Sequence, residues 1–431
     1  RILNYNPESD DVAYKWVSIY GKNNRVDHCT FTGKNHEGAL LVVWLTGTAN
    51  YHHIDHNYFS DIPRLNRNGA ETIRIGTSTN SFTESRSVVE YNVFEKCDGE
   101  IEVISNKSGF NIYRFNTFRN NDGGLTLRHG NDCEVYGNFF YGTATKSCSG
   151  VRIIGERHKV YNNYFQDLEG TGTRAAICLM NGVPNSPLNR YFQVKDAEVM
   201  HNTIVSCKQA LSFGSGKSDE LSLPPLNPLV ANNIIDKSSA APISYVDNPI
   251  NITYASNIVF YNNLNLTDTG IINQNPGLTL SNGLWRTDRS SIAYNSAAQL
   301  RSYVVTDMDG QTRDDSPDIG SDEVSEETIT NKPLTKNDVG ANWDNTTAGI
   351  VHDLMNITPK VYAVNQSIHF SNVPSRFTSF QIQVIDMRSQ IISNLVTTNP
   401  SNPVELLQAK GVYIVRLFYE GQSFYQGKIV L

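Results

Sequence analysis

Two glutamates and a lysine stand close together in the stretch EIEVISNKSG, residues 100–109. Glu100 and Glu102 alternate with apolar residues, which is the pattern of a β-strand with one apolar face and one acidic face. A solvated sheet face is the simplest source of such a pattern. The alternative is a cation site, because two neighbouring carboxylates repel each other when unpaired and supply the oxygen ligands that Ca²⁺ prefers. Lys107, just past the predicted strand, would then lie beside the cation.

Lys107 could serve as a base at such a site. Its ammonium form is disfavoured next to a cation and arginines, so we expect its pKa to fall toward that of a working base. Three arginines would make the surface around the cation positive enough to bind an anionic sugar: Arg74, Arg128 and Arg152. A metal on the carboxylate of a uronic acid stabilises the carbanion formed when the C5 proton leaves. The residues predict β-elimination, in which Arg128 stabilises or protonates the leaving O4, and stabilisation is the easier role for an arginine.

The element that must position these residues is a single parallel sheet. Four runs can be laid over one another: ETIRIG from Glu71, EIEVIS from Glu100, GLTLRHG from Gly124 and GVRIIG from Gly150. Their apolar positions then fall into register as Ile73 and Ile75, Ile101 and Val103, Leu125 and Leu127, and Val151 and Ile153. The opposite parity points outward and carries Thr72 and Arg74, Glu100 and Glu102, Thr126 and Arg128, and Arg152. Because neighbouring rungs lie roughly 4.8 Å apart, these side chains could meet around one sugar ring.

A repeated asparagine predicts how the sheet is built. It is followed two positions later by Phe or, in later copies, by an aliphatic residue in most cases, and it stands at Asn57, Asn92, Asn116, Asn138, Asn163, Asn202, Asn233 and Asn263. The runs between copies are short and β-rich, with no long helical pattern, which favours one coil of a solenoid per copy. We therefore predict an all-β chain with a right-handed parallel β-helix. Each asparagine should bond the backbone of a turn and its copy one rung away, while the Phe points inward.

The composition changes near the C-terminus. Residues 344–348 have the composition of a polar linker, and residues 349–431 contain alternating strands with turn signals between them, which predicts a small antiparallel β-sandwich. The ending, GVYIVRL and GKIVL, resembles the C-terminal sorting domain of the type IX secretion system. This resemblance implies secretion machinery as a partner and a secreted or cell-surface location. A carbohydrate-binding module is the alternative, although the tail has no cluster of tryptophans.

Four linked motifs carry a more specific resemblance: NGAETIRIG, CDGEIEVISNKSG, NNDGGLTLRHG and SGVRIIGERHKVYNNYF. From about Asn57 to Trp343, the sequence is similar to polysaccharide lyase family 6, which contains alginate lyases and chondroitinase B. The resemblance implies a β-helix lyase domain over residues 1–343 and calcium that neutralises the uronate carboxylate. The fold of that family begins with several rungs before the first segment present here, so we expect N-terminal rungs to be missing.

The resemblance also assigns roles by motif. It implies that Lys107 is the base and Arg128 the acid. The implied calcium ligands are Asn68, Glu100 and Glu102. His129 and Arg152 would hold the substrate, and Arg74 would add to the positive surface that binds it.

Composition limits the partners. Lys and Arg number 36 and Asp and Glu 43, and the resulting net charge of −7 argues against a nucleic-acid partner. No apolar run is long enough to span a membrane. The six cysteines lack zinc-like spacing and are predicted to be buried residues, not a disulfide framework.

The sequence thus predicts a secreted, calcium-dependent lyase of an anionic polysaccharide, with alginate as the first candidate and dermatan sulfate as the second. Two alternatives belong to other classes. One is a hydrolase that uses Glu100 and Glu102 as acid and base without a metal. The other is a non-catalytic β-helix that binds polysaccharide. Preference for mannuronate or guluronate, and endo or exo action, depend on loop shapes that composition does not determine.

Overall fold

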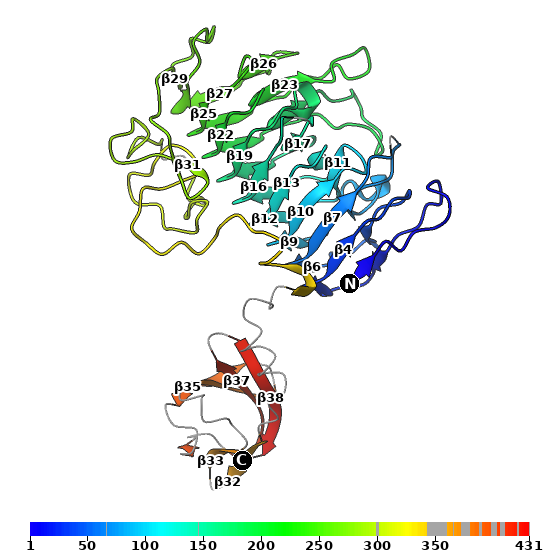
Figure 1. Cartoon of the computed structure of the whole chain (residues 1–431), viewed down its shortest axis with the longest axis vertical. Helices are drawn as coiled ribbons and strands as arrows, with labels where there is room; N and C mark the ends of the chain where they lie inside the picture. Colours follow the sequence, from blue (N-terminus) through cyan, green and yellow to red (C-terminus); the bar gives the residue numbers. More distant parts are fainter. Residues whose placement is uncertain are drawn as a thin grey trace. The chain divides into compact units, whose positions relative to one another are not determined.

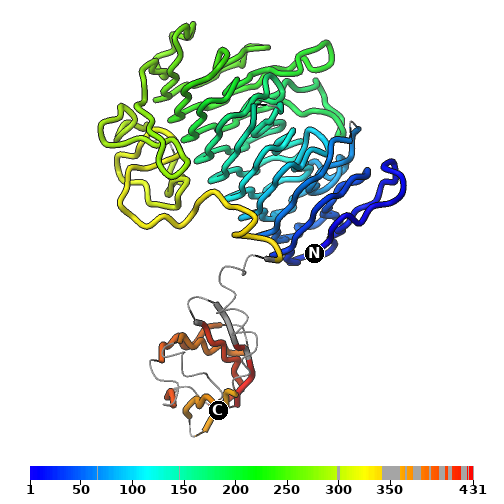
Figure 2. The backbone as a smooth tube through the Cα atoms, in the orientation of Figure 1, coloured from blue at the N-terminus to red at the C-terminus, as the bar shows by residue number. Residues whose placement is uncertain are grey.

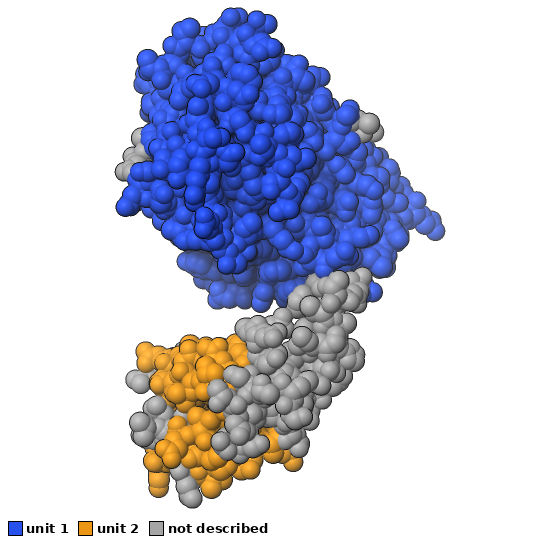
Figure 3. Space-filling view, turned by 60° about the vertical axis from the view of Figure 1, so that its left-hand side comes forward, with its two compact units in different colours: residues 1–343 blue, residues 344–431 orange. Residues whose placement is uncertain are grey.

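The computed structural model of the chain describes residues 1–65, 67–144, 146–298, 301–342, 360–364, 366–371, 380–387, 390–397, 403–405, 410–419 and 422–430. The chain divides into two compact units, residues 1–343 and residues 344–431 (Figure 3). The predicted linker over residues 344–348 lies outside the described residues. Among the described helices, none is long and apolar enough to cross a membrane.

The larger unit winds in successive rungs. The strands of neighbouring rungs pair to form three parallel sheets, here called sheets A, B and C (Figures 1 and 2). Sheet A consists of β1 (Ile2–Leu3), β4 (Thr30–Thr32), β7 (Tyr58–Ile62), β10 (Val93–Cys97), β13 (Thr117–Arg119), β16 (Phe139–Tyr141), β19 (Tyr164–Gln166), β22 (Thr203–Val205), β25 (Ile234–Asp236), β28 (Asn257–Val259) and β29 (Ile271–Ile272). Sheet B consists of β2 (Val17–Ile19), β5 (Leu41–Val43), β8 (Ile73–Ile75), β11 (Glu102–Lys107), β14 (Gly124–His129), β17 (Val151–Ile153), β20 (Ile177–Met180), β23 (Leu211–Ser215) and β26 (Ile243–Tyr245). Sheet C consists of β3 (Arg25–Asp27), β6 (His53–Asp55), β9 (Val88–Glu90), β12 (Ile112–Arg114), β15 (Glu134–Tyr136), β18 (Lys159–Tyr161), β21 (Glu198–Met200), β24 (Leu229–Ala231) and β27 (Thr253–Ala255). The predicted parallel β-helix is confirmed.

Buried asparagines form a ladder along the turn that leads from sheet C to sheet A. The backbone N–H of Asn57 and its side-chain amide both donate to Asn92 Oδ1, at 2.9 and 3.0 Å. The same backbone contact continues through Asn116, Asn138, Asn163, Asn202 and Asn233 to Asn257. A buried amide is costly unless it is hydrogen bonded, and the ladder satisfies each amide with the next rung. The predicted structural role of the asparagines is confirmed. The prediction was wrong for the last of them, because Asn263 is exposed and Asn257 ends the ladder.

The Phe residues that follow the asparagines point inward, as predicted. Phe59, Phe94, Phe118, Phe140 and Phe165 stack in one column, which Phe31 of β4 continues by one rung. Their neighbouring ring centroids are between 4.5 and 5.1 Å apart. This spacing matches the rung repeat of parallel strands, so one aromatic ring per rung fills the core.

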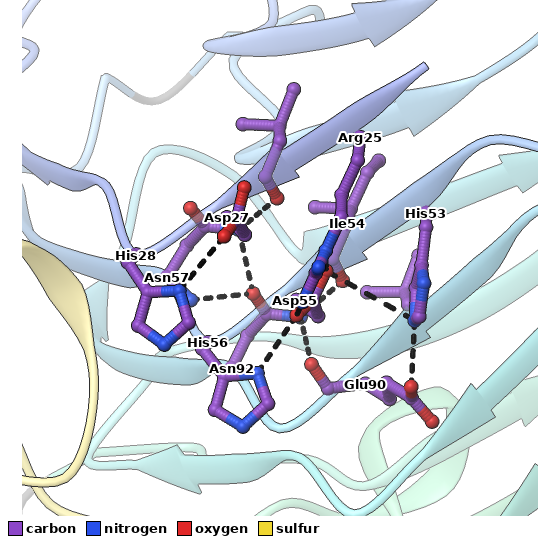
Figure 4. A network of polar contacts seen from close by, with 12 residues as sticks. Arg25, Asp27, His28, His53, Ile54, Asp55, His56, Asn57, Glu90 and Asn92 are labelled. Carbon is purple, nitrogen blue, oxygen red and sulfur yellow. Dashed lines mark hydrogen bonds and ion pairs between the residues drawn. The ribbon is translucent and has the colours of Figure 1, made fainter. Parts of the chain in front are cut away.

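The outer face of sheet C carries charges that the chain pairs internally (Figure 4). Arg25 donates two hydrogen bonds to Asp55, at 2.8 and 2.6 Å, and His56 Nδ1 lies 2.8 Å from the same carboxylate. Burial raises the pKa of Asp55, but the bonds with Arg25 and His56 outweigh it and hold the pKa well below its usual value. His53 Nε2 lies 2.6 Å from Glu90 Oε1. These groups neutralise one another, so this face is structural.

Residues that follow the last rung cover the outer face of sheet A. This segment contains the hairpin of β30 (Thr279–Ser281) and β31 (Leu284–Arg286) and ends in the 3₁₀ helix η3 (Gly340–Asn342). Leu334 and Val339 pack against Val93, and Ile319 packs in the cluster that contains Phe139. Two further 3₁₀ turns, η1 (Ser78–Asn80) and η2 (Gly172–Arg174), lie in loops at the two ends of sheet B strands.

The smaller unit is antiparallel. One sheet has the order β32 (Lys360–Val364), β33 (Ser367–Ser371) and β36 (Val404–Glu405), and the other has the order β35 (Ile391–Thr397), β34 (Phe380–Ile385), β37 (Val412–Tyr419) and β38 (Gln422–Val430). Both sheets contribute to one core, in which Ile368 of the first packs with Ile382 and Leu417 of the second. The predicted small antiparallel β-sandwich is confirmed.

Candidate active site

The outer face of sheet B brings the predicted site residues together, with one change of register. β11 pairs Ile104 with Ile73 of β8 and Leu125 of β14, whereas the alignment by alternation placed Ile101 there. A bulge between Glu102 and Ile104 breaks the alternation. The predicted register was therefore wrong for this rung, because alternation is informative only along a regular strand.

The bulge keeps Glu102 on the outer face. Val103 and Ile104 both reach the core, and Ser105 Oγ donates to Glu102 Oε2 at 2.5 Å. Asn106 then enters the core, where its amide and carbonyl are hydrogen bonded. Glu102 and Ser105 therefore lie on the same side of the sheet, although three positions separate them.

Three glutamates converge at the start of these strands. One carboxylate oxygen from each of Glu71, Glu100 and Glu102 lies within 4.8 Å of the others, and Glu71 and Glu102 are buried. Burial and the charges of Glu71 and Glu102 raise the pKa of Glu100 to about 8. The three residues are named here the open triad, because Glu100 is only half-buried and lines a cleft.

The sequence prediction had named Asn68, Glu100 and Glu102 as ligands, without Glu71. Asn68 and Glu100 line the same cleft, of about 400 Å³, together with Arg64 and Arg174. Glu71 was not among the predicted ligands, although it begins the run ETIRIG as Glu100 begins the run EIEVIS. A glutamate at the start of both runs was the signal that could have found it.

Lys107 and Arg128 both lie within 4 Å of the open triad. Lys107 ends β11, and its Nζ is 3.5 Å from Glu71 Oε1. Arg128 Nε is 3.8 Å from Glu102 Oε1, and its guanidinium lies 3.9 Å from the ring centroid of Tyr191. Burial lowers the pKa of Arg128, but a guanidinium keeps its charge at any physiological pH. An ammonium and a guanidinium thus face the same acidic group.

The remaining predicted site residues are His129, Arg152 and Arg74. His129 is buried, and neither ring nitrogen has a hydrogen-bond partner among the described residues. Burial and the charges of Arg128 and Lys107 lower the pKa of His129 to about 3, so the ring is neutral. Arg152 donates to Glu102, and the Arg74 guanidinium lies 5.5 Å from the Trp44 ring centroid.

A second acidic group lies outside sheet B. Oxygens of Asp307, Asp309 and Asp322 are also within 4.8 Å of one another, and all three residues are buried. Arg286 forms ion pairs with Asp309 and Asp322. Asp307 accepts three backbone N–H groups, at 2.8 to 2.9 Å. This closed triad is held by the chain itself.

Comparison with known proteins places the chain in a family. The model of the family described as chondroitinase B matches residues 2–318. The chain belongs to the chondroitinase B family. A comparison with curated proteins gave no match.

Solved structures extend the assignment of this chondroitinase B family member to polysaccharide lyase family 6, as predicted. A variant of the PL6 family alginate lyase AlyGC has a TM-score of 0.68 and 33% identity over 79% of this chain. A mannuronic acid specific family 6 lyase from human gut microbiota has a TM-score of 0.58 and 32% identity over 64% of this chain. The PL6 family lyase Pedsa3628 from Pseudopedobacter saltans has a TM-score of 0.56 and 25% identity over 79% of this chain. The chain spans 44% of the AlyGC chain, 66% of the gut lyase and 75% of Pedsa3628.

Proposed function

We propose that the chain is a calcium-dependent polysaccharide lyase that cleaves a uronate polymer by β-elimination, with alginate as its substrate. The observation that carries the proposal is the convergence of Lys107, Arg128 and the open triad on the outer face of sheet B. A base, a positive group for the leaving oxygen and a site for the uronate carboxylate are the three requirements of this reaction. The similarity to alginate lyases of known structure supports the same substrate class.

The open triad fits a calcium ion. Its donors are all carboxylate oxygens, which suit a hard cation, and a cation would favour the ionised form of Glu100, whose pKa is raised by burial and by the charges of Glu71 and Glu102. Glu71, Glu100 and Glu102 would hold the ion, and Asn68 lies close enough to the same cleft to join them. Bound there, Ca²⁺ would neutralise the substrate carboxylate and let it accept the charge of the carbanion.

The chain's own residues would carry the proton transfers. Lys107 in its neutral form takes the C5 proton, and the electron pair of that bond forms the C4–C5 double bond while the C4–O4 bond breaks. Arg128 stabilises the departing O4, which takes up a proton from water. Neutral His129 can donate or accept one hydrogen bond to the sugar, and Arg152 holds Glu102 in place while facing the substrate.

The test is a comparison of two polymers. The full chain is mixed with alginate and, separately, with dermatan sulfate, and the absorbance of the 4,5-unsaturated product is followed. We expect product from alginate. Product from dermatan sulfate alone would favour the second candidate, for which Arg64 and Arg174 in the cleft beside Glu100 offer sites for sulfate. Binding of either polymer without product would favour a non-catalytic role, and new reducing ends without the chromophore would indicate hydrolysis.

We also propose that residues 344–431 direct export through the type IX secretion machinery, so that the protein acts outside the cell or at its surface. The similarity of GVYIVRL and GKIVL to the sorting domain supports this role. In cells that contain this machinery, a chain lacking residues 344–431 should stay inside while the full chain reaches the surface or medium. Equal export of both chains would leave the carbohydrate-binding alternative.

A further inference from the structure

Two long loops meet beside the candidate active site. Residues 76–87 connect β8 to β9, and residues 181–197 connect β20 to β21, so both loops leave the corner between sheets B and C. The rings of Phe82 and Phe192 contact edge to face, with centroids 4.9 Å apart. Ser81 Oγ donates to the carbonyl of Leu188 at 2.8 Å. The two loops, named here the arch, therefore join across several rungs.

The arch spans the rungs that carry the proposed chemistry. The rungs of β11, β14 and β17 lie between the strands β8 and β20, from which the two loops start, and their own connections at this corner are short. Lys107 ends β11 at this corner, and Arg128 lies one residue before the end of β14. The arch therefore forms a wall along the corner side of Lys107 and Arg128, and a polymer on sheet B has to run along the axis of the coil.

The second loop of the arch, residues 181–197, covers the outer face of sheet B just beyond the site. Ile154, Cys178 and Met180 form an apolar cluster with Tyr191 of the arch, and all three are at most 3% exposed. Cys178 pairs with Arg152 and shares its outward parity, so burial of this cluster shows that the outer face is covered there. The seal begins one to two rungs past Arg128, about 5 to 10 Å away. That distance leaves room for only one or two sugar residues on this side.

The opposite side of the site is open and suited to sugars. Tyr20, which follows β2, is 59% exposed and stacks on Trp44 with ring centroids 6.1 Å apart. Arg74 lies over the same Trp44 ring. Stacked aromatic rings beside a guanidinium can hold a sugar ring and a carboxylate. The outer face of sheet B is thus open on one side of Lys107 and Arg128 and sealed on the other.

We propose that this one-sided face makes the enzyme exolytic: it binds the end of a polymer chain and releases products of one or two sugar residues from it. The Phe82–Phe192 contact keeps the seal in place, which makes these two residues determinants of product length. The inference rests on the proposed lyase activity. An internal stretch of polymer would have to cross the cluster of Ile154, Cys178 and Tyr191, where the described structure leaves the sheet covered.

The experiment follows bond cleavage and chain length together. The full-length protein acts on alginate, unsaturated product is measured by absorbance, viscosity is recorded, and the products are separated by size. Wild-type protein should release mono- and disaccharides from the earliest time, while viscosity falls slowly for each bond broken. Combining Phe82→Ala with Phe192→Ala should add longer oligosaccharides and make viscosity fall several-fold faster for each bond broken. Leu280→Ala, which removes another exposed apolar side chain in β30, should change neither readout.

The contrary results are distinct. A broad range of oligosaccharides from the wild-type protein, with early loss of viscosity, would overturn the sealed face and leave the lyase proposal standing. Short products from both the wild-type protein and the folded double variant would overturn the role of the arch. If the double variant does not fold, Ser81→Ala replaces it, because this variant removes only a hydroxyl that contacts the carbonyls of Leu188 and Ser78. Absence of unsaturated product in every case would refute the lyase proposal and, with it, this inference.

Discussion

The two acidic triads of the larger unit have similar carboxylate spacing but differ in access to solvent. In the closed triad, Arg286 pairs with Asp309 and Asp322, and backbone N–H groups cap Asp307. In the open triad, Glu102 has arginine partners, but Glu100 lines a cleft and its pKa is raised to about 8. Proximity of carboxylates therefore does not by itself define a cation site, and the half-buried Glu100 on a cleft distinguishes the open triad from the fully buried closed triad.

The difference also separates activity from stability. The closed triad has no base beside it in the described residues, and Arg286 forms a permanent counterion. The open triad has Lys107 and Arg128 at its edge, on a face that the polymer can reach. Changes at the open triad should therefore act on turnover, and changes at the closed triad should act on folding.

The largest effect is expected for Lys107→Ala. Loss of a general base typically lowers the rate by about 10² to 10⁴-fold, so lyase activity on alginate should nearly disappear. The melting temperature should stay close to that of the wild-type protein. Lys159→Ala is the matched control, because Lys159 pairs with Glu134 on sheet C, away from the site, and its loss should leave activity intact.

Removal of calcium should have the next largest effect. If the ion stabilises the carbanion by about 3 kcal/mol, EGTA should lower the initial rate roughly 100-fold, and added Ca²⁺ should restore it. The assay is the initial rate of absorbance increase with alginate at fixed pH. A rate that EGTA leaves unchanged would remove the metal from the mechanism.

At the closed triad, Arg286→Met should affect folding. Breaking a buried ion pair leaves uncompensated carboxylates, so the free energy of unfolding should fall by about 3 kcal/mol. Urea unfolding of the two proteins measures the difference. Arg289→Met removes an exposed ion pair with Glu326 and should change stability by less than about 0.5 kcal/mol. Equal losses for the two variants would contradict the structural role of the closed triad.

The smallest effect concerns pH. The pKa of Glu100 in the folded chain is about 8, above its ordinary value of 4.5, so the unfolded chain releases this proton first as pH rises. Without calcium, stability should therefore be greatest below about pH 4.5 as far as this group is concerned, and it should fall as pH rises toward 8. Calcium should remove this loss, since it favours the ionised carboxylate. Melting temperatures in EGTA and in Ca²⁺, measured near pH 5 and near pH 8, test this, and Glu100→Gln should abolish the difference.

The sequence predicted the β-helix because its signals are local and repeated. The asparagine at Asn57 and the Phe at Phe59 recur once per rung, so each copy supports the same fold. Lys107 and Arg128 could be placed on one face for the same reason, because they lie on neighbouring rungs. The C-terminal β-sandwich followed from alternation over residues 349–431.

What the sequence did not predict depends on irregular backbone or distant loops. The bulge at Glu102 breaks the alternation on which the register was based. Tyr191 reaches Arg128 from a loop more than sixty residues further along the chain, and no local pattern encodes the path of that loop. Glu71 was present in the alignment, but only its distance from Glu100 and Glu102 identifies it as part of the triad.

Calorimetric titration of Ca²⁺ into the EGTA-treated and dialysed chain tests the central claim most directly, because it reports the ion without the reaction. The account predicts that the wild-type protein binds one ion, that Asp309→Asn binds one ion equally well, and that Glu102→Gln loses this binding. Binding that survives Glu102→Gln and disappears in Asp309→Asn would place the cation at the wrong triad and contradict the account.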